Sequence, residues 1–159
     1  MTTQPRSLFK SIMGKRVGLG AYGQLATQQP TTVLDITPKC VDASITVSAE
    51  GTPGADQRAI TITLKDAHGN AIDYAETVDI VMLLNSGGTD FVATGGSTGI
   101  AIGASGKLLT LLAKKVFKAI STTSGVIALT WTDTGTEAAF LGLYLPNGTR
   151  VISSTLQNA

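Results

Sequence analysis

This chain has few of the residues that small proteins use for cross-links, metal sites or strong charge. Its single cysteine, Cys40, excludes an internal disulfide framework and a cysteine cluster for zinc. Its single histidine is His68, and charged residues make up only 14% of the chain. We therefore expect apolar burial and backbone pairing to hold the fold together, with Cys40 as a small buried or half-buried filler.

Long apolar runs are also missing. No stretch approaches the roughly 20 apolar residues that span a bilayer, and the start, MTTQPRSLFK, lacks the apolar core of a secretion signal. A length of 159 residues suits one domain with a short extension. We predict a soluble chain that is made in the cytoplasm and does not contact a membrane.

The best-defined segment runs from residue 58 to residue 74. Ile60, Ile62 and Leu64 alternate with polar residues, which predicts a half-buried strand. The turn that follows is Asp66-Ala67-His68-Gly69-Asn70, in which Asp66 can accept bonds from its own turn and Gly69 can take a positive φ. A second strand is expected to begin near Tyr74.

Similar alternation recurs along the chain between clusters of turn residues, which indicates an antiparallel sandwich or barrel. The predicted strands cover residues 43–48, 59–65, 77–84, 91–93, 99–102, 115–121, 125–132, 138–145 and 150–154. Asn147-Gly148 predicts a two-residue hairpin turn of the primed type. Ile127, Leu129 and Trp131 are expected to share one core with the apolar residues of 59–65. Residues 107–118 carry leucines at helical spacing, so a helix is the alternative there.

The first 32 residues combine basic and apolar side chains. Between residues 1 and 39 the acidic residue is Asp35, whereas the basic residues are Arg6, Lys10, Lys15, Arg16 and Lys39. Residues 7–13 predict a short amphipathic helix, the glycines after it end that helix, and residues 24–32 read as a linker. An arm this apolar is expected to dock, either on its own domain or on a neighbour.

We therefore predict an arm and linker over residues 1–32 and a domain over residues 33–159. The side chains predicted to bind a partner are Arg6, Leu8, Phe9, Lys10, Ile12, Met13, Lys15 and Arg16. A small basic cluster that is merely solvated is the alternative for the charged members of this set.

Motifs for nucleotide binding fail on their context. Residues 18–23 fit G-x-G-x-x-G, but neither a strand before them nor a helix after them is predicted, and a dinucleotide site requires both. Gly106-Lys107 lacks the spacing and the hydroxyl residue of a phosphate loop. We predict no nucleotide cofactor and no nucleic-acid partner.

Catalytic and metal-binding constellations are equally weak. His68 and Asp66 lie two residues apart on one turn, which does not place the imidazole between a carboxylate and a nucleophile. Asp66, Asn70 and Asp73 lack the spacing of a calcium loop, and ordinary turn chemistry accounts for them, as it does for the acidic residues of WTDTGTEAAF. We predict that the protein is not an enzyme and holds no cofactor or metal.

Two segments resemble a known family. ITITLKDAHGNAIDYAETVDIVML resembles the bacterial Ig-like repeats of the invasin and intimin kind, in which a strand, a D-x-x-G-N turn and a valine-rich strand follow one another. VFKAISTTSGVIALTWTD is similar to the closing part of such repeats. The resemblance covers roughly residues 42–132 and implies an all-β fold, an Ig-like antiparallel β-sandwich with an extended N-terminal arm. The tail FLGLYLPNGTRVISSTL adds a further hairpin.

The resemblance also implies a class of function. A lone Ig-like domain with no expected signal peptide, membrane anchor or tandem copy suits a bacteriophage virion better than a cell-surface adhesin. We expect a capsid decoration or accessory protein, located in the virion, that contacts other virion proteins and forms a homo-oligomer in the assembled particle. A tail or baseplate component, or a carbohydrate-binding or adhesin-like Ig module, is the alternative.

Overall fold

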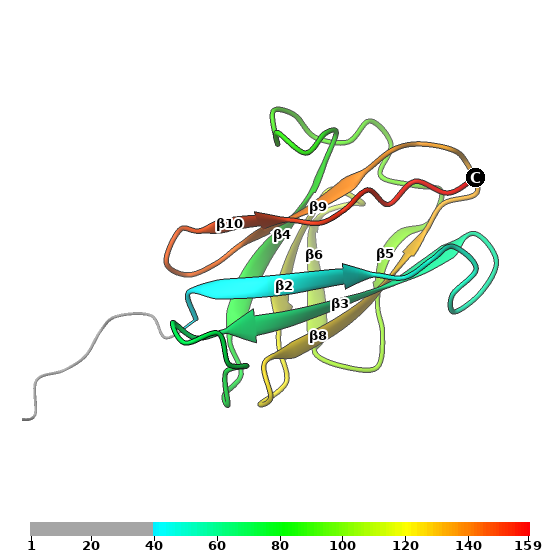
Figure 1. The fold of residues 1–159 in the computed structure, drawn as a ribbon. Coiled ribbons are helices and arrows are strands. Elements are labelled where there is room, and N and C mark those ends of the chain that lie inside the picture. The colour runs from blue at the N-terminus through cyan, green and yellow to red at the C-terminus, as the bar shows by residue number, and fades with distance from the viewer. Residues whose placement is uncertain (1–39) are drawn as a thin grey trace, which may run out of the picture. The chain divides into compact units, whose positions relative to one another are not determined.

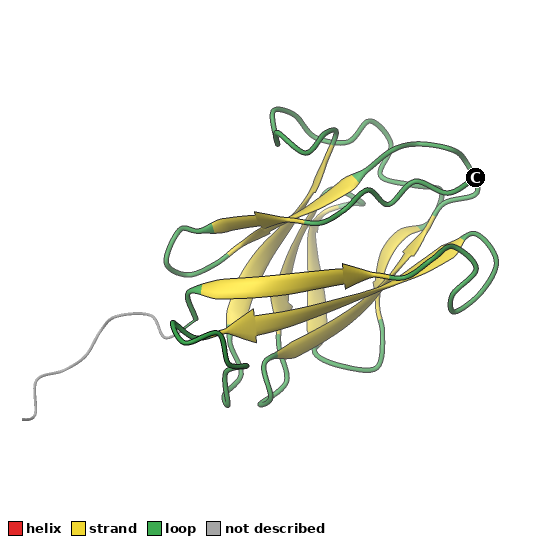
Figure 2. Cartoon of the chain, viewed as in Figure 1, coloured by secondary structure: helices red, strands yellow, loops and turns green. Residues whose placement is uncertain are grey.

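The computed structural model describes residues 40–159, and these residues form two antiparallel sheets without a helix (Figures 1 and 2). One sheet has the order β2-β3-β8-β5 and the other the order β10-β9-β4-β7-β6. The strands are β2 (Asp42–Val47), β3 (Gln57–Lys65), β4 (Thr77–Leu83), β5 (Gly99–Ile102), β6 (Lys107–Leu112), β7 (Val116–Ile120), β8 (Val126–Thr132), β9 (Phe140–Tyr144) and β10 (Arg150–Ile152). The predicted all-β class is confirmed.

The core lies between the two sheets, as in a β-sandwich. The six residues predicted to share it, three from β3 and three from β8, are all buried in one apolar cluster. The five-stranded sheet contributes large, fully buried side chains to the same cluster, namely Ile80, Met82, Phe117, Leu141 and Leu143. Cys40 and Trp131 are also fully buried, so both were correctly predicted as core residues.

The two predicted turns form, although one differs in type. Asp66 Oδ1 accepts the N–H groups of His68 and Asn70 at 2.8 and 2.9 Å, and Gly69 has a φ of 86°, as predicted. The β9–β10 hairpin is confirmed, but its turn is not of the primed type. Gly148 has a positive φ and Asn147 does not. The reason is Pro146, whose fixed φ favours the second position of an ordinary type I turn, with Gly148 after it.

Most predicted strands agree with the structure to within a few residues, but one predicted strand is missing and β6 was not predicted as a strand. Residues 91–93 form only an isolated bridge, between Leu83 and Phe91. The helix offered as an alternative over residues 107–118 is wrong, because β6, a turn and β7 occupy this segment. Leu111 and Leu112 are largely exposed, whereas Leu108 packs against the core from the edge strand, so their spacing did not mark one buried helical face.

Several predictions fall outside the described residues. These are the short helix over 7–13, the linker over 24–32 and the limit between arm and domain at residue 33. Within residues 40–159, no helix is long and apolar enough to cross a membrane.

The burial of Leu129 gives a test of this core. Replacing Leu129 by Ala should lower the free energy of unfolding by about 2–5 kcal/mol, through lost burial and the cavity left behind. Leu109 on β6 is the matched control, because its side chain is 60% exposed, and its replacement by Ala should change stability by less than about 0.5 kcal/mol. Urea denaturation of both variants measures the difference, and equal losses would contradict the assignment of the two faces.

Candidate docking surface

The outward faces of the two sheets differ in chemistry. Side chains alternate between the faces of a strand, so the residues between the core positions of β2, β3 and β8 point outward. These outward residues are small and mostly carry hydroxyl groups: Ser44, Thr46, Thr61, Thr63, Ala128 and Thr130. Such a face is readily solvated.

The five-stranded sheet instead carries an apolar row on its outward face. The pairing register places one residue from each strand in this row, which we call the outer row: Leu112, Val116, Val81, Gly142 and Ile152. Leu83 lies over Gly142, where a Cβ would come within 2.5 Å of its Cδ1, so glycine makes room for this leucine. The outer row therefore forms a continuous apolar strip across the sheet.

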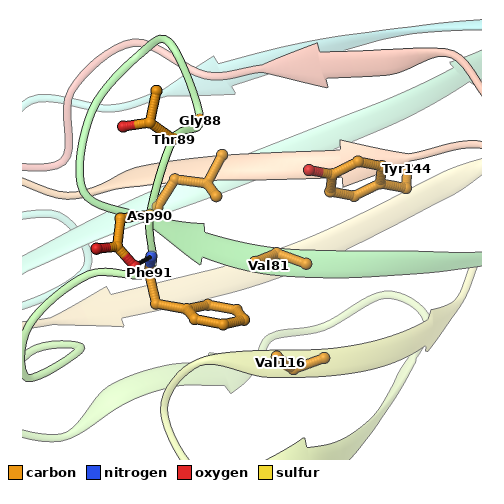
Figure 3. Close-up of a pocket in the computed structure, with 8 residues that line it drawn as sticks. Val81, Gly88, Thr89, Asp90, Phe91, Val116 and Tyr144 are labelled. Carbon is orange, nitrogen blue, oxygen red and sulfur yellow. Dashed lines mark hydrogen bonds between the residues drawn. The ribbon is translucent and has the colours of Figure 1, made fainter.

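Val81 and Val116 in the outer row line a hollow of about 410 Å³ (Figure 3). We call it the outer hollow, and its lining residues are Val81, Leu83, Gly88, Thr89, Asp90, Phe91, Val116 and Tyr144. Phe91 is 46% exposed, and its ring lies beside Val81 and Val116. The outer hollow is thus mostly apolar, with polar groups from the 84–90 loop along one wall.

Hydrogen bonds fix the loop that forms this wall. The Leu84 N–H donates to the Asp90 carbonyl at 3.0 Å and closes the loop at its base. The Asn85 side chain donates to the Thr89 hydroxyl at 2.9 Å. Arg150 on β10 donates to the Gly87 carbonyl at 3.2 Å. The loop is therefore held from within and from a neighbouring strand, and the outer hollow is largely preformed.

Two carboxylates hold the segment that follows Phe91. Glu137 accepts hydrogen bonds from the hydroxyl and the N–H of Thr94. Asp133 Oδ1 accepts the N–H groups of Ser97 and Gly135 at 2.9 and 3.2 Å. Burial raises the pKa of Glu137, but the Thr94 hydroxyl and neighbouring backbone N–H groups outweigh it, so the pKa lies below its ordinary value. Both acids therefore act as anchors for backbone.

The residues considered above as catalytic, metal-binding or nucleotide-binding groups have structural roles in turns. The side chain of Asp66 accepts turn amides, and those bonds, from Asn70 and His68 in that order, lower its pKa. His68 is exposed on this turn. Gly106 has a φ of 89°, and its backbone passes close to the Ile120 carbonyl. Among residues 40–159, no group of three or more His, Cys, Asp or Glu side chains is placed to hold a metal ion.

The eight arm residues predicted to bind a partner lie outside the described residues, and their role stays a prediction. They are Arg6, Leu8, Phe9, Lys10, Ile12, Met13, Lys15 and Arg16. The sequence did not reveal the outer hollow, because Val81, Phe91, Val116 and Tyr144 meet only through the order of the strands. The one available signal was the apolar side chains at positions 81 and 116, which alternate out of phase with the core positions.

The lowered pKa of Glu137 predicts a pH effect. Because the folded value lies below the unfolded value of about 4.3, ionised Glu137 stabilises the fold above that pH. This contribution is lost as pH falls through the folded value. Glu137→Gln should therefore destabilise the protein at neutral pH by less than about 1 kcal/mol, since the group is partly exposed. The gap to the unsubstituted protein should narrow below about pH 4.3. Urea titrations between pH 7 and pH 3 test this, with Asp90→Asn as control; a gap independent of pH would contradict it.

Comparison of the chain with protein-family models, with curated proteins and with solved structures finds no match. Its function is therefore inferred from its residues and their geometry.

Proposed function

We propose that this protein is a non-enzymatic structural protein of a bacteriophage virion, a capsid decoration or accessory protein with an Ig-like sandwich and an N-terminal arm. The observation that carries the proposal is the apolar outer row, with the outer hollow, on the outward face of the five-stranded sheet. Contiguous apolar surface of this kind marks a site of protein contact. The virion setting rests on the resemblance to Ig-like repeats, which by itself does not fix function.

The two outward faces favour docking in one orientation. The hydroxyl-rich face of the four-stranded sheet is compatible with water. Phe91 and the outer row are apolar, so covering them with a partner stabilises the complex. Specific protein contacts bury about 1,200–2,000 Å² in total. A face that crosses five strands offers a broad platform for such a contact.

Attachment in many copies would lower the affinity that each contact needs. A rigid sandwich that docks by one face and an arm that reaches a neighbour form two linked contacts, and linkage raises the effective concentration of the second. The predicted arm residues include both charges and large apolar groups, which suits a second contact of this kind. Other virion proteins are the proposed partners, with copies of this chain as neighbours in the assembled particle.

Phe91 gives the direct test. Replacing Phe91 by Asp should reduce co-sedimentation of the purified full-length chain with phage particles that lack it by at least tenfold, because a charge would enter an apolar contact. Thr46→Asp is the control, since Thr46 is exposed on the outward face of β2 in the other sheet. Circular dichroism should show both variants folded. Full loading of the Phe91 variant, or equal loss in both, would argue against this face.

The arm gives a second, separate test. Deleting residues 1–30 should leave the melting temperature of the domain nearly unchanged and abolish its incorporation into particles. Attachment of the full chain should weaken as salt rises, because the basic arm residues would face acidic groups. A truncated chain that still loads onto particles at full occupancy would show that the arm is not the anchor. Immunogold labelling of the particles separates a capsid position from a tail or baseplate position.

A carbohydrate-binding Ig module is the second candidate, favoured by one observation. Phe91 and Tyr144 both line the outer hollow, where Thr89 and Asp90 add polar groups. An apolar cleft with a few placed polar groups is the common form of a small-ligand site. Titration calorimetry with a panel of oligosaccharides decides between the two: saccharide binding that Phe91→Ala abolishes would favour this candidate over particle docking.

A further inference from the structure

The β6–β7 hairpin exposes more apolar surface than its place in a sheet requires. Within the described residues β6 is the last strand of its sheet and pairs with β7 alone. Leu109, Leu111 and Leu112 are 60%, 56% and 50% exposed, and Ile120 on β7 is 44% exposed. The register shifts between Thr110 and Leu112, which leaves Leu111 as a bulged residue. The strand is therefore an apolar edge rather than a buried one.

The hydrogen-bond pattern shows which backbone groups of β6 face outward. The Ser121 N–H donates to the Glu76 carbonyl, and the Met82 N–H donates to the Lys115 carbonyl. The odd-numbered residues of the β7 segment therefore direct their backbone groups toward β4. Antiparallel ladders alternate, and the even-numbered residues of β7 therefore turn toward β6.

The alternation extends one strand further. Lys107 and Leu109 are partners of even-numbered β7 residues, so their backbone groups turn inward to β7. Leu108 and Thr110 consequently direct their N–H and C=O groups to the open edge. Within residues 40–159, β6 pairs with no strand other than β7, and no turn or loop hydrogen bond engages these groups. They provide donors and acceptors for one more strand.

A second hollow accompanies this edge. It has a volume of about 260 Å³ and is lined by Thr77, Lys107, Leu108, Leu109, Lys118 and Ile120. Its wall is apolar, and the two lysines add cationic groups. A site of this kind suits an apolar side chain that has a carboxylate beside it.

The positive charge of the β6–β7 hairpin indicates the chemistry of the partner. From Phe91 to Thr132 the chain contains no acidic residue, whereas the hairpin and its turn carry Lys107, Lys114, Lys115 and Lys118. Within the described region, the one ion pair joins Lys118 to Asp79 on β4. Lys114 donates to the carbonyls of Gly96 and Ser97 at 3.1 and 2.8 Å. Lys107 and Lys115 have no such partner in residues 40–159, and they stand at the two ends of the leucine-rich edge.

The same lysines argue against a second copy of this chain. In an antiparallel pairing of two β6 strands, Lys107 of one copy would lie beside the Lys115 end of the other. In a parallel pairing, identical lysines would lie side by side. Like charges directly opposite each other destabilise a strand pair, and lysines at an edge are a common protection against self-pairing. The basic arm is disfavoured as an occupant for the same reason.

We propose that the open edge of β6 binds an extended segment of another protein, with an apolar centre and acidic residues at its ends, by strand addition. Backbone bonds to Leu108 and Thr110 give affinity, the second hollow takes one apolar side chain, and Lys107 and Lys115 select for the acidic ends. This deepens the proposed docking role by naming the chemistry of one partner. Because the site is separate from the outer hollow, it can be tested without particles.

Fluorescence anisotropy with the full-length chain provides the test. The probe is a labelled peptide of alternating valine and threonine with two glutamates at each end. It should bind at least tenfold more tightly than peptides with lysine for glutamate, or with serine for valine. N-methylation of the alternate amides that face β6 should abolish binding, because it removes the backbone donors while the protein stays unchanged, whereas N-methylation of the other alternate set should be tolerated. Equal binding of acidic and basic peptides, or binding that survives N-methylation of both sets of alternate amides, each tested in its own peptide, would overturn the proposal.

Protein variants complete the design. Thr110→Pro removes an outward N–H and should weaken probe binding at least tenfold. Lys107→Glu with Lys115→Glu should reverse the preference toward the basic peptide. Lys65→Glu on β3 is the control and should bind as the unsubstituted chain does, and Phe91→Asp should retain peptide binding even where it loses particles. Absence of probe binding would overturn the proposal when it is accompanied by either of two results. Sedimentation on phosphatidylserine vesicles would assign the edge to a membrane. Dimers that Thr110→Pro abolishes would assign it to a second copy of the chain.

Discussion

The packing of β3 and β8 against β4, β7 and β9 is the interaction on which the rest of this structure depends. With Cys40 the single cysteine and charged residues scarce, the inward side chains of these strands supply most of the available stabilisation. Each fully buried aliphatic or aromatic side chain contributes about 1.5–3 kcal/mol, which is offset largely by the entropy of ordering the chain. Because strand side chains alternate, a slip of one residue would expose every inward position of a strand at once. The core therefore fixes the pairing register of both sheets.

A fixed register also fixes what each sheet presents to its surroundings. Thr61 and Thr63 lie between the core residues of β3 and can only face outward, and the same holds for Val81 between Ile80 and Met82 on β4. The outward residues are free of the core constraint, so their character reports another requirement. On one sheet the residues between the core positions are small and mostly hydroxyl-bearing, and on the other the apolar outer row lies beside the Asp79–Lys118 pair. This contrast within one domain is the strongest structural indication that the five-stranded sheet meets a partner.

Local pattern was sufficient to predict the strands whose alternation marks one buried face. Residues 59–65 and 125–132 were predicted as strands that share a core, and β3 and β8 are neighbours whose side chains do so. Pattern failed for β6, because at an exposed edge the leucines of KLLTLL do not report a buried face. It also missed the outer hollow, since Phe91 and Tyr144 are brought together by strand order, which composition and spacing do not encode. The effect of Pro146 on the β9–β10 turn is encoded in the sequence, because a proline directly before Asn-Gly favours an ordinary type I turn over a primed one.

The two lateral sides of the described domain differ in whether the chain covers them, and β6 lies on the uncovered side. On one side β10 lies beside β2 (Figure 1). The segment after β10 continues along β9, where the Leu156 N–H donates to the Ala139 carbonyl at 2.8 Å. Asn158 is buried there and bonds to the carbonyls of Asp56 and Asp133, while Arg58 holds its side-chain oxygen. The chain thus covers that side with its own backbone and polar side chains. On the opposite side the described chain leaves β6 uncovered and sets lysines along it. Since an uncovered edge is a liability that folds usually suppress, the contrast within residues 40–159 between a covered side and an open, apolar and positively charged β6 supports the proposed addition of a strand of opposite charge.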